Sequence, residues 1–114
     1  MDECIFCEII EREAPAPILY EDEDTVAFSD IEPQAPVHIL VTPRKHIRTV
    51  ADLTDDDERI VGRMVLVASH LAKKYDICQH GFRLVFNCNR DAGQDIYHIH
   101  LHLLGGRRMS WPPG

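Results

Sequence analysis

Three histidines alternate with apolar residues near the end of the chain, in the segment Tyr97-His98-Ile99-His100-Leu101-His102-Leu103. Successive side chains of a β-strand point to opposite faces of the sheet. A strand here would therefore place the histidines on one face and the apolar residues on the other, where they can join a core. The pattern predicts a strand over residues 96–104 with one face available for chemistry.

The histidine face has three interpretations. The first is a strand face exposed to solvent, but lysine, threonine or glutamate would cover such a face more simply than three histidines. A three-histidine zinc site is the second, although the outer pair on a straight strand is too widely spaced to share one ion easily. Nucleophilic catalysis is the third, because a neutral imidazole attacks phosphorus well near its pKa and neighbouring groups can fix its tautomer.

The rest of the chain predicts a small α+β fold. We expect a short helix over residues 5–12, with Ile5, Ile9 and Phe6 on one face. A long helix should begin at Thr54 as N-cap and end near Tyr75. Strands are expected over residues 18–21, 25–30, 38–42, 82–88 and 96–104, with a polar loop over residues 89–95. The long helix should face the sheet through Ile60, Met64, Val67, Leu71 and Tyr75. This is a five-stranded antiparallel meander sheet with one long and one short helix, forming a single domain over residues 1–114.

Charge and composition narrow the classes of partner. The formal net charge of −7 disfavours non-specific binding to a nucleic-acid backbone. No apolar run approaches the length of a membrane span, and Met1-Asp2-Glu3 lacks the basic start of a secretory signal. We therefore expect a cytoplasmic protein without nucleic-acid or membrane partners, whose four cysteines are thiols or metal ligands.

The segment from His98 to Leu104 resembles the His-φ-His-φ-His-φ-φ signature of the histidine-triad (HIT) superfamily, where φ is apolar. The resemblance covers essentially the whole chain, through Ala27-Phe28-Ser29-Asp30-Ile31, Pro33-Gln34-Ala35-Pro36-Val37-His38, Pro43-Arg44-Lys45-His46-Ile47, Asn87 and Gly93-Gln94. Two segments near the end of the chain resemble the histidine triad nucleotide-binding branch, also called protein kinase C inhibitor-like. They are Leu104-Gly105-Gly106-Arg107 and Trp111-Pro112-Pro113-Gly114.

This resemblance implies an enzyme that hydrolyses purine nucleoside phosphoramidates, such as AMP joined to an amine or to lysine, through a covalent nucleotidyl-histidine. Hydrolysis of dinucleoside polyphosphates is an alternative that belongs to another branch, and the Trp-Pro-Pro-Gly tail speaks against it. The nucleotidyl-transferase branch usually lacks histidine at the third triad position. A non-catalytic nucleotide-binding regulatory protein is an alternative from a different class.

The resemblance also implies roles for four catalytic residues. His100 resembles the nucleophile, and His102 resembles the histidine that contacts the phosphate. Asn87 would donate an amide hydrogen to a phosphate oxygen, as stabilisation of transition-state charge requires. His38 would lie near His100 and help to position it, or it would be a partly buried histidine bonded to backbone.

Nucleotide binding would involve residues on both sides of the triad. Asp30 resembles the acidic residue that accepts both ribose hydroxyls, because a carboxylate has two acceptor oxygens. Gly93 and Gln94 would shape the loop over the phosphate. Asp95 stands where the best-known members carry a hydroxyl residue; it would face a protonated amine leaving group, or turn outward while its backbone N–H contacts phosphate. The apolar slot for the base, or else plain core packing, is expected from Phe6, Ile9, Phe28 and Ile31.

Cys4-Ile5-Phe6-Cys7 is a second constellation. A Cys-x-x-Cys pair at a helix start serves redox chemistry or forms half of a zinc site, and alone the motif is weak. The βαβ setting of a redox pair is missing. Histidine-triad proteins with this cysteine pair hold zinc with two cysteines and two histidines, which implies a structural zinc at Cys4, Cys7, His46 and His98. No cofactor is expected for catalysis.

We also expect a symmetric homodimer. A sheet this small leaves an uncovered edge, and Val61, Val65 and Ala68 add apolar surface beside the core stripe of the long helix. In the family that the chain resembles, protomers join into a continuous sheet. The tail Met109 to Gly114 is then expected to help form the partner's substrate site, unless it is simply a disordered terminus.

Overall fold

The fold is built on one antiparallel sheet. The structure is a computed structural model that describes residues 4–114. The prediction made from Met1-Asp2-Glu3 concerns residues outside this range. The strands of the sheet are β1 (Ile18–Glu21), β2 (Thr25–Ser29), β3 (Val37–Pro43), β4 (Phe82–Phe86) and β5 (Leu101–Gly105). The helices are α1 (Ile5–Ile10), α2 (Glu58–Lys74) and α3 (Asn89–Ala92), with 3-10 turns at Val50–Asp52 and Asp55–Asp57.

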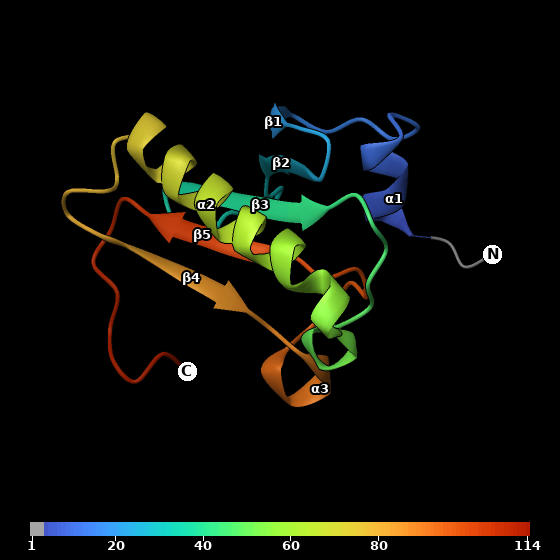
Figure 1. Ribbon diagram of the computed structural model, residues 1–114. Helices are drawn as coiled ribbons and strands as arrows, with labels where there is room; N and C mark the ends of the chain where they lie inside the picture. Colours follow the sequence, from blue (N-terminus) through green and yellow to red (C-terminus); the bar gives the residue numbers. More distant parts are fainter. Residues whose placement is uncertain (1–3) are drawn as a thin grey trace.

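The predicted five-stranded antiparallel sheet is confirmed, with one correction to its order. The strands lie in the order β1-β2-β3-β5-β4 (Figure 1), and all neighbours are antiparallel. Only β1, β2 and β3 form a meander. The chain then crosses along α2 to the edge strand β4 and returns through β5, which pairs with both β3 and β4.

Different helices pack against the two faces of the sheet. One face packs against α2, whose Met64, Val67, Ala68, Leu71 and Ala72 are buried in a cluster with Ile39, Val41, Leu101 and Leu103. The other face packs against α1, whose Phe6, Ile9 and Ile10 are buried with Val26, Phe28 and Leu40. Strand alternation therefore divides β3 between two cores, and it places His102 of β5 on the α1 side.

The predicted cap at Thr54 is found on the 3-10 turn Asp55–Asp57, which leads directly into α2 at Glu58. Thr54 and Asp57 form a capping box, in which the Thr54 N–H donates to Asp57 Oδ2 at 3.0 Å. Lys45 pairs with the same carboxylate at 2.7 Å. These contacts satisfy free amides at the helix start and tie it to the segment after β3.

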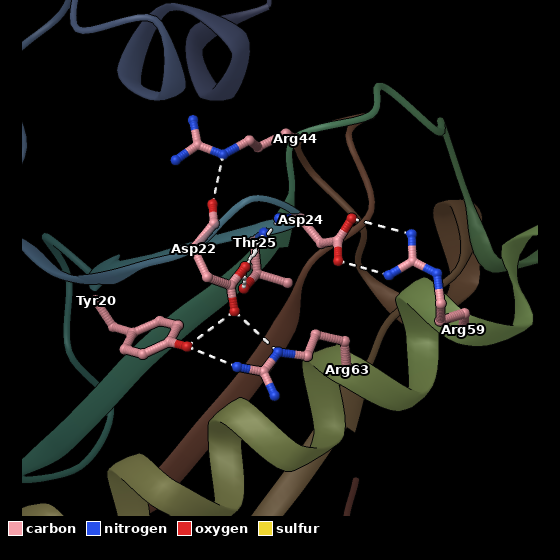
Figure 2. A network of polar contacts seen from close by, with 7 residues as sticks. All are labelled: Tyr20, Asp22, Asp24, Thr25, Arg44, Arg59 and Arg63. Atoms are coloured by element: carbon pink, nitrogen blue, oxygen red, sulfur yellow. Dashed lines mark hydrogen bonds and ion pairs between the residues drawn. The ribbon is translucent and has the colours of Figure 1, made fainter.

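A polar network joins the turn between β1 and β2 to the first turns of α2 (Figure 2). Arg63 Nε donates to Asp22 Oδ2 at 2.9 Å, and Arg59 Nη1 donates to Asp24 Oδ2 at 2.6 Å. Burial alone would raise the pKa of Asp22, but the hydrogen bonds that its carboxylate accepts from Thr25 and others outweigh burial and hold the pKa well below its usual range. Asp22 is therefore ionised, and it fixes the end of the sheet against α2.

Three local expectations were wrong. The strand predicted over residues 96–104 begins only at Leu101, because Val41 of β3 and Phe86 of β4 are the last partners opposite it. The polar loop contains the helical turn α3, which Gly93 ends with a φ of 85°. Ile5 does not share the buried face of the first helix but is 44% exposed, because Phe6, Ile9 and Ile10 form the face against the sheet.

Among residues 4–114, no helix is long and apolar enough to cross a membrane.

Candidate functional site

A cavity of about 480 Å³ opens on the α1 side of the sheet. Its walls come from α1, from β2 and the loop after it, from β3, and from the segment that enters β5. The apolar lining consists of Ile5, Phe6, Ile9, Pro15, Ala16, Phe28, Ile31, Leu40 and Ile96. The polar lining consists of Ser29, Asp30, Glu32, Gln34, His38, Asp95, His100 and His102. The cavity thus joins an apolar slot to a group of histidines.

The tautomer of His100 follows from its hydrogen bond to the backbone. Its Nδ1 lies 2.8 Å from the carbonyl oxygen of His98, which can only accept, so Nδ1 carries the proton. The lone pair is then on Nε2. The ring is buried at 6% exposure and packs edge-on against Phe6 at 5.1 Å between ring centroids. His100 can therefore act as an oriented nucleophile through Nε2.

A second hydrogen-bond chain fixes His38 and His102. The Gln34 N–H donates to His38 Nδ1 at 3.0 Å, so the proton of His38 is on Nε2. That Nε2–H donates to His102 Nδ1 at 2.9 Å, and His102 then carries its proton on Nε2. Two neighbouring rings thus offer opposite groups, a lone pair on His100 and an N–H on His102.

Burial keeps these imidazoles neutral. It lowers the pKa of His102 to about 4, assisted by the neighbouring His100 and His38. Burial also lowers the pKa of His38, although Asp30, with Oδ2 at 3.4 Å from His38 Nε2, opposes this effect. Neutral rings are hydrogen-bond donors and nucleophiles near pH 7 but add no positive charge.

Four further side chains gather beside the cavity. Their ligand atoms, from Cys4, Cys7, His46 and His98, all lie within 4.8 Å of one another. Cys4 Sγ and His98 Nδ1 are 3.4 Å apart, and the Nδ1 atoms of His46 and His98 are 3.1 Å apart. Edges of about 3.3 to 3.8 Å are expected for sulfur and nitrogen ligands in a tetrahedron around zinc.

Tautomers distinguish this cluster from a second one, formed by Asp30, His38 and His102. His98 Nε2 lies 2.8 Å from the carbonyl oxygen of Pro43 and is its donor, which leaves the Nδ1 lone pair for a metal ion. In the second cluster the Gln34 amide occupies the lone pair on Nδ1 of His38, so its Nε2 carries a proton. The first cluster fits a metal ion, and the second is a hydrogen-bond chain.

Some of the other predicted site residues line the cavity and some do not. Phe6, Ile9, Phe28, Asp30 and Asp95 line the cavity, and so does Ile31, which is 88% exposed. Asn87, Gly93 and Gln94 do not line it. The Gln94 amide is buried and bonds to the Asn89 N–H and to the carbonyl oxygens of Arg48 and Ile96, so it shapes the loop.

Gln34 was missed as a functional residue. It acts through its backbone amide, whose position no side-chain pattern reveals. Arg107 Nε donates to the Gln34 carbonyl oxygen at 2.9 Å and helps to hold this residue in place. The wall residues Pro15, Ala16, Leu40 and Ile96 were also missed, and no spacing signal singles them out.

The surfaces expected in a dimer are only partly as predicted. Val65 and Leu66 on α2 are 40% and 55% exposed. Ala68, expected as surplus surface, is fully buried because it faces the sheet. Trp111 in the tail is 81% exposed, and Arg83 Nη2 donates to the carbonyl oxygen of Ser110 at 3.0 Å.

Comparisons with known proteins agree with this geometry. The model of the HIT domain family matches residues 11–109. A purine nucleoside phosphoramidase from Escherichia coli (strain K12) is 50% identical over 109 residues, which cover 96% of this chain and 92% of the relative. The crystal structure of a HIT family hydrolase from Legionella pneumophila Philadelphia 1 is 50% identical, with a TM-score of 0.97 over 98% of this chain and 100% of that one.

A further similar structure contains metal. It is a Zn-bound histidine triad family protein from Mycobacterium smegmatis, 33% identical, with a TM-score of 0.79 over 91% of this chain and 75% of that chain.

Proposed function

The chain belongs to the HIT domain family, and on this premise we propose that it hydrolyses purine nucleoside phosphoramidates. The observation that carries the proposal is the Nε2 lone pair of His100, oriented by the His98 carbonyl in a cavity that also holds an apolar slot. The 50% identity to a purine nucleoside phosphoramidase supports this choice of substrate.

The reaction would proceed in two displacements at phosphorus. His100 Nε2 attacks, a P–N bond to His100 forms, and the P–N bond to the amine breaks while the amine nitrogen takes up one proton. Water then attacks the nucleotidyl-histidine, releases one proton and returns the free imidazole. His102 donates its Nε2–H to a phosphoryl oxygen as negative charge develops there.

The nucleoside would lie across the rest of the cavity. The base would enter between Phe6, Ile9 and Phe28, whose buried faces exclude water. The Asp30 carboxylate, at the polar end of β2, would accept the two ribose hydroxyls. Asn87, which follows β4, does not line this cavity, and its side chain would donate to a phosphate oxygen at the cavity's edge.

The test is turnover of an adenosine phosphoramidate with rapid quench and mass spectrometry. Wild type should accumulate a nucleotidylated peptide that contains His100. His100→Ala should lose several orders of magnitude in kcat while its affinity for AMP stays within about tenfold, because bond formation is removed rather than binding. His70→Ala, on the exposed side of α2, is the control and should keep full activity. An active His100→Ala protein would refute the proposal.

We also propose that Cys4, Cys7, His46 and His98 hold a structural zinc ion. The soft and borderline donors, their spacing and the His98 tautomer support this. Such an ion would join the start of α1 to the segment after β3 and to the triad segment. It would keep the Phe6 wall in place and take no part in bond breaking.

We further propose that the protein is a homodimer. The edge strand β4 and the exposed Val65 and Leu66 of α2 support an interface along this side. Two sheets would join at β4 about a two-fold axis, as in the commonest class of oligomer. The tail, with its exposed Trp111, would then reach the partner's cavity.

A further inference from the structure

The cavity beside His100 has an unusual charge for a site that takes a phosphate group. Three carboxylates line it, those of Asp30, Glu32 and Asp95, and among the residues described in its walls there is no lysine or arginine. The chain as a whole has a formal net charge of −7. A cleft lined by charges of one sign focuses that potential on whatever enters it.

The histidines do not compensate for these carboxylates. Burial lowers the pKa of both His38 and His102, the latter to about 4, so both rings are neutral near pH 7. Their N–H groups can bind a phosphoryl oxygen through hydrogen bonds. They do not offset the charge of a substrate that carries several phosphates.

Arginines close to the site in sequence have other partners. The Arg48 guanidinium lies 5.0 Å from the centroid of the Tyr97 ring, and Arg90 pairs with Asp91 at 3.0 Å. Arg107 donates to the Gln34 carbonyl oxygen. None of the three lines the cavity.

Asp30 and Asp95 both act electrostatically on His102, and Asp95 is the one of these two carboxylates that accepts no hydrogen bond in the described structure. Asp30 already accepts a hydrogen bond from the Glu32 N–H at 2.8 Å and lies against His38. Asp95 is exposed at the cavity wall and follows Gln94, whose buried amide makes three hydrogen bonds that fix the turn. Within residues 4–114 the Asp95 carboxylate has no hydrogen-bond or ion-pair partner, and it acts electrostatically on His102.

We infer that Asp95 selects nucleoside phosphoramidates whose leaving amine carries a second, cationic group, such as a diamine or a lysine-like amine. The inference rests on the proposed function and deepens it. The phosphoramidate itself has one negative charge, and a cationic leaving group beside Asp95 brings the substrate close to neutrality. A dinucleoside polyphosphate would instead direct several negative charges at the same wall.

The test compares three AMP phosphoramidates of equal chain length, made from 1,6-diaminohexane, hexylamine and 6-aminohexanoate. In wild type, kcat/KM should fall in the order cationic, neutral, anionic, with about tenfold between the extremes at low salt. Asp95→Asn should reduce this ratio by roughly threefold or more, and Asp95→Glu should retain it. Asp91→Asn removes the same charge four positions away, outside the cavity, and should leave the ratio unchanged.

A wild-type ratio near one, or the same ratio in wild type and Asp95→Asn, would overturn the inference. Calorimetric binding of the three compounds to His100→Ala protein measures the same preference without turnover. Loss of the preference in the His100→Ala/Asp95→Asn protein would support the inference. Equal affinities of the three compounds for the His100→Ala protein, in which Asp95 is intact, would overturn it. Absence of turnover for all three compounds would refute only the proposed function.

Discussion

Burial of the His102 imidazole makes the stability of the fold depend on pH. The pKa of His102 is lowered from its ordinary value of 6.5 to about 4 by burial and by the neighbouring histidines. Between these two values the unfolded chain binds a proton that the folded chain does not, so the free energy of unfolding should fall as the pH falls through this window. His102→Gln should reduce that dependence in urea titrations at pH 4.5 to 6.5, leaving the part that the buried His38 contributes, and the exposed His80→Gln should not. Equal slopes for wild type and His102→Gln would contradict the prediction.

At this scale the sequence predicted which residues meet but not which atoms they present. Strand alternation placed His98, His100 and His102 together, and all three do lie toward the α1 side. The proton positions depend on the His98 and Pro43 carbonyls and on the Gln34 amide. Backbone groups are the same in every residue, so no pattern of side chains indicates where they converge.

At the scale of elements, we expect the stability of α1 to depend on the proposed zinc site. A six-residue helix is too short to be stable alone, and it provides Phe6 and Ile9 to the cavity wall. Cys4→Ser/Cys7→Ser should lose one zinc per chain in elemental analysis, lower the Tm by several degrees and raise the KM for the phosphoramidate. Cys78→Ser, at an exposed cysteine, is the control. Unchanged stoichiometric zinc in the double variant would contradict the site.

The predicted bounds of helices and strands were correct where local periodicity sets them. They were wrong where pairing with distant segments sets them. The apolar spacing of α2 and the capping signal at Thr54 are local properties. Both are found, although Thr54 caps the 3-10 turn Asp55–Asp57 that leads into α2. The start of β5 at Leu101 is set by the ends of β3 and β4, which are distant in the chain. The turn of α3 is closed by the Gln94 side chain on the Asn89 N–H, a contact that no propensity expresses.

At the scale of the whole molecule, the unpaired edge and the apolar patch of α2 lie on surfaces that a second copy would cover. Leu66 is 55% exposed in the middle of α2, so Leu66→Lys should place two like charges near the two-fold axis and weaken the dimer without disturbing the core. Light scattering at micromolar concentration should give a dimer for wild type and for Leu66→Met, and a shift toward monomer for Leu66→Lys. A monomeric wild type would refute the homodimer.

The C-terminal tail, residues 109–114, makes few contacts with its own chain. Trp111 is 81% exposed, and Arg83 supplies the one side-chain hydrogen bond found to residues 109–114 in the described structure. If the tail instead docks beside the partner's cavity, deleting residues 109–114 should leave the Tm nearly unchanged and alter the KM for substrates with bulky leaving groups. Trp111→Ala should reproduce most of that change, since the indole offers the largest apolar surface in the segment. Identical kinetics across several leaving groups after the deletion would exclude a role for the tail, whereas a change that disappears in the monomeric Leu66→Lys protein would assign the contact to the partner.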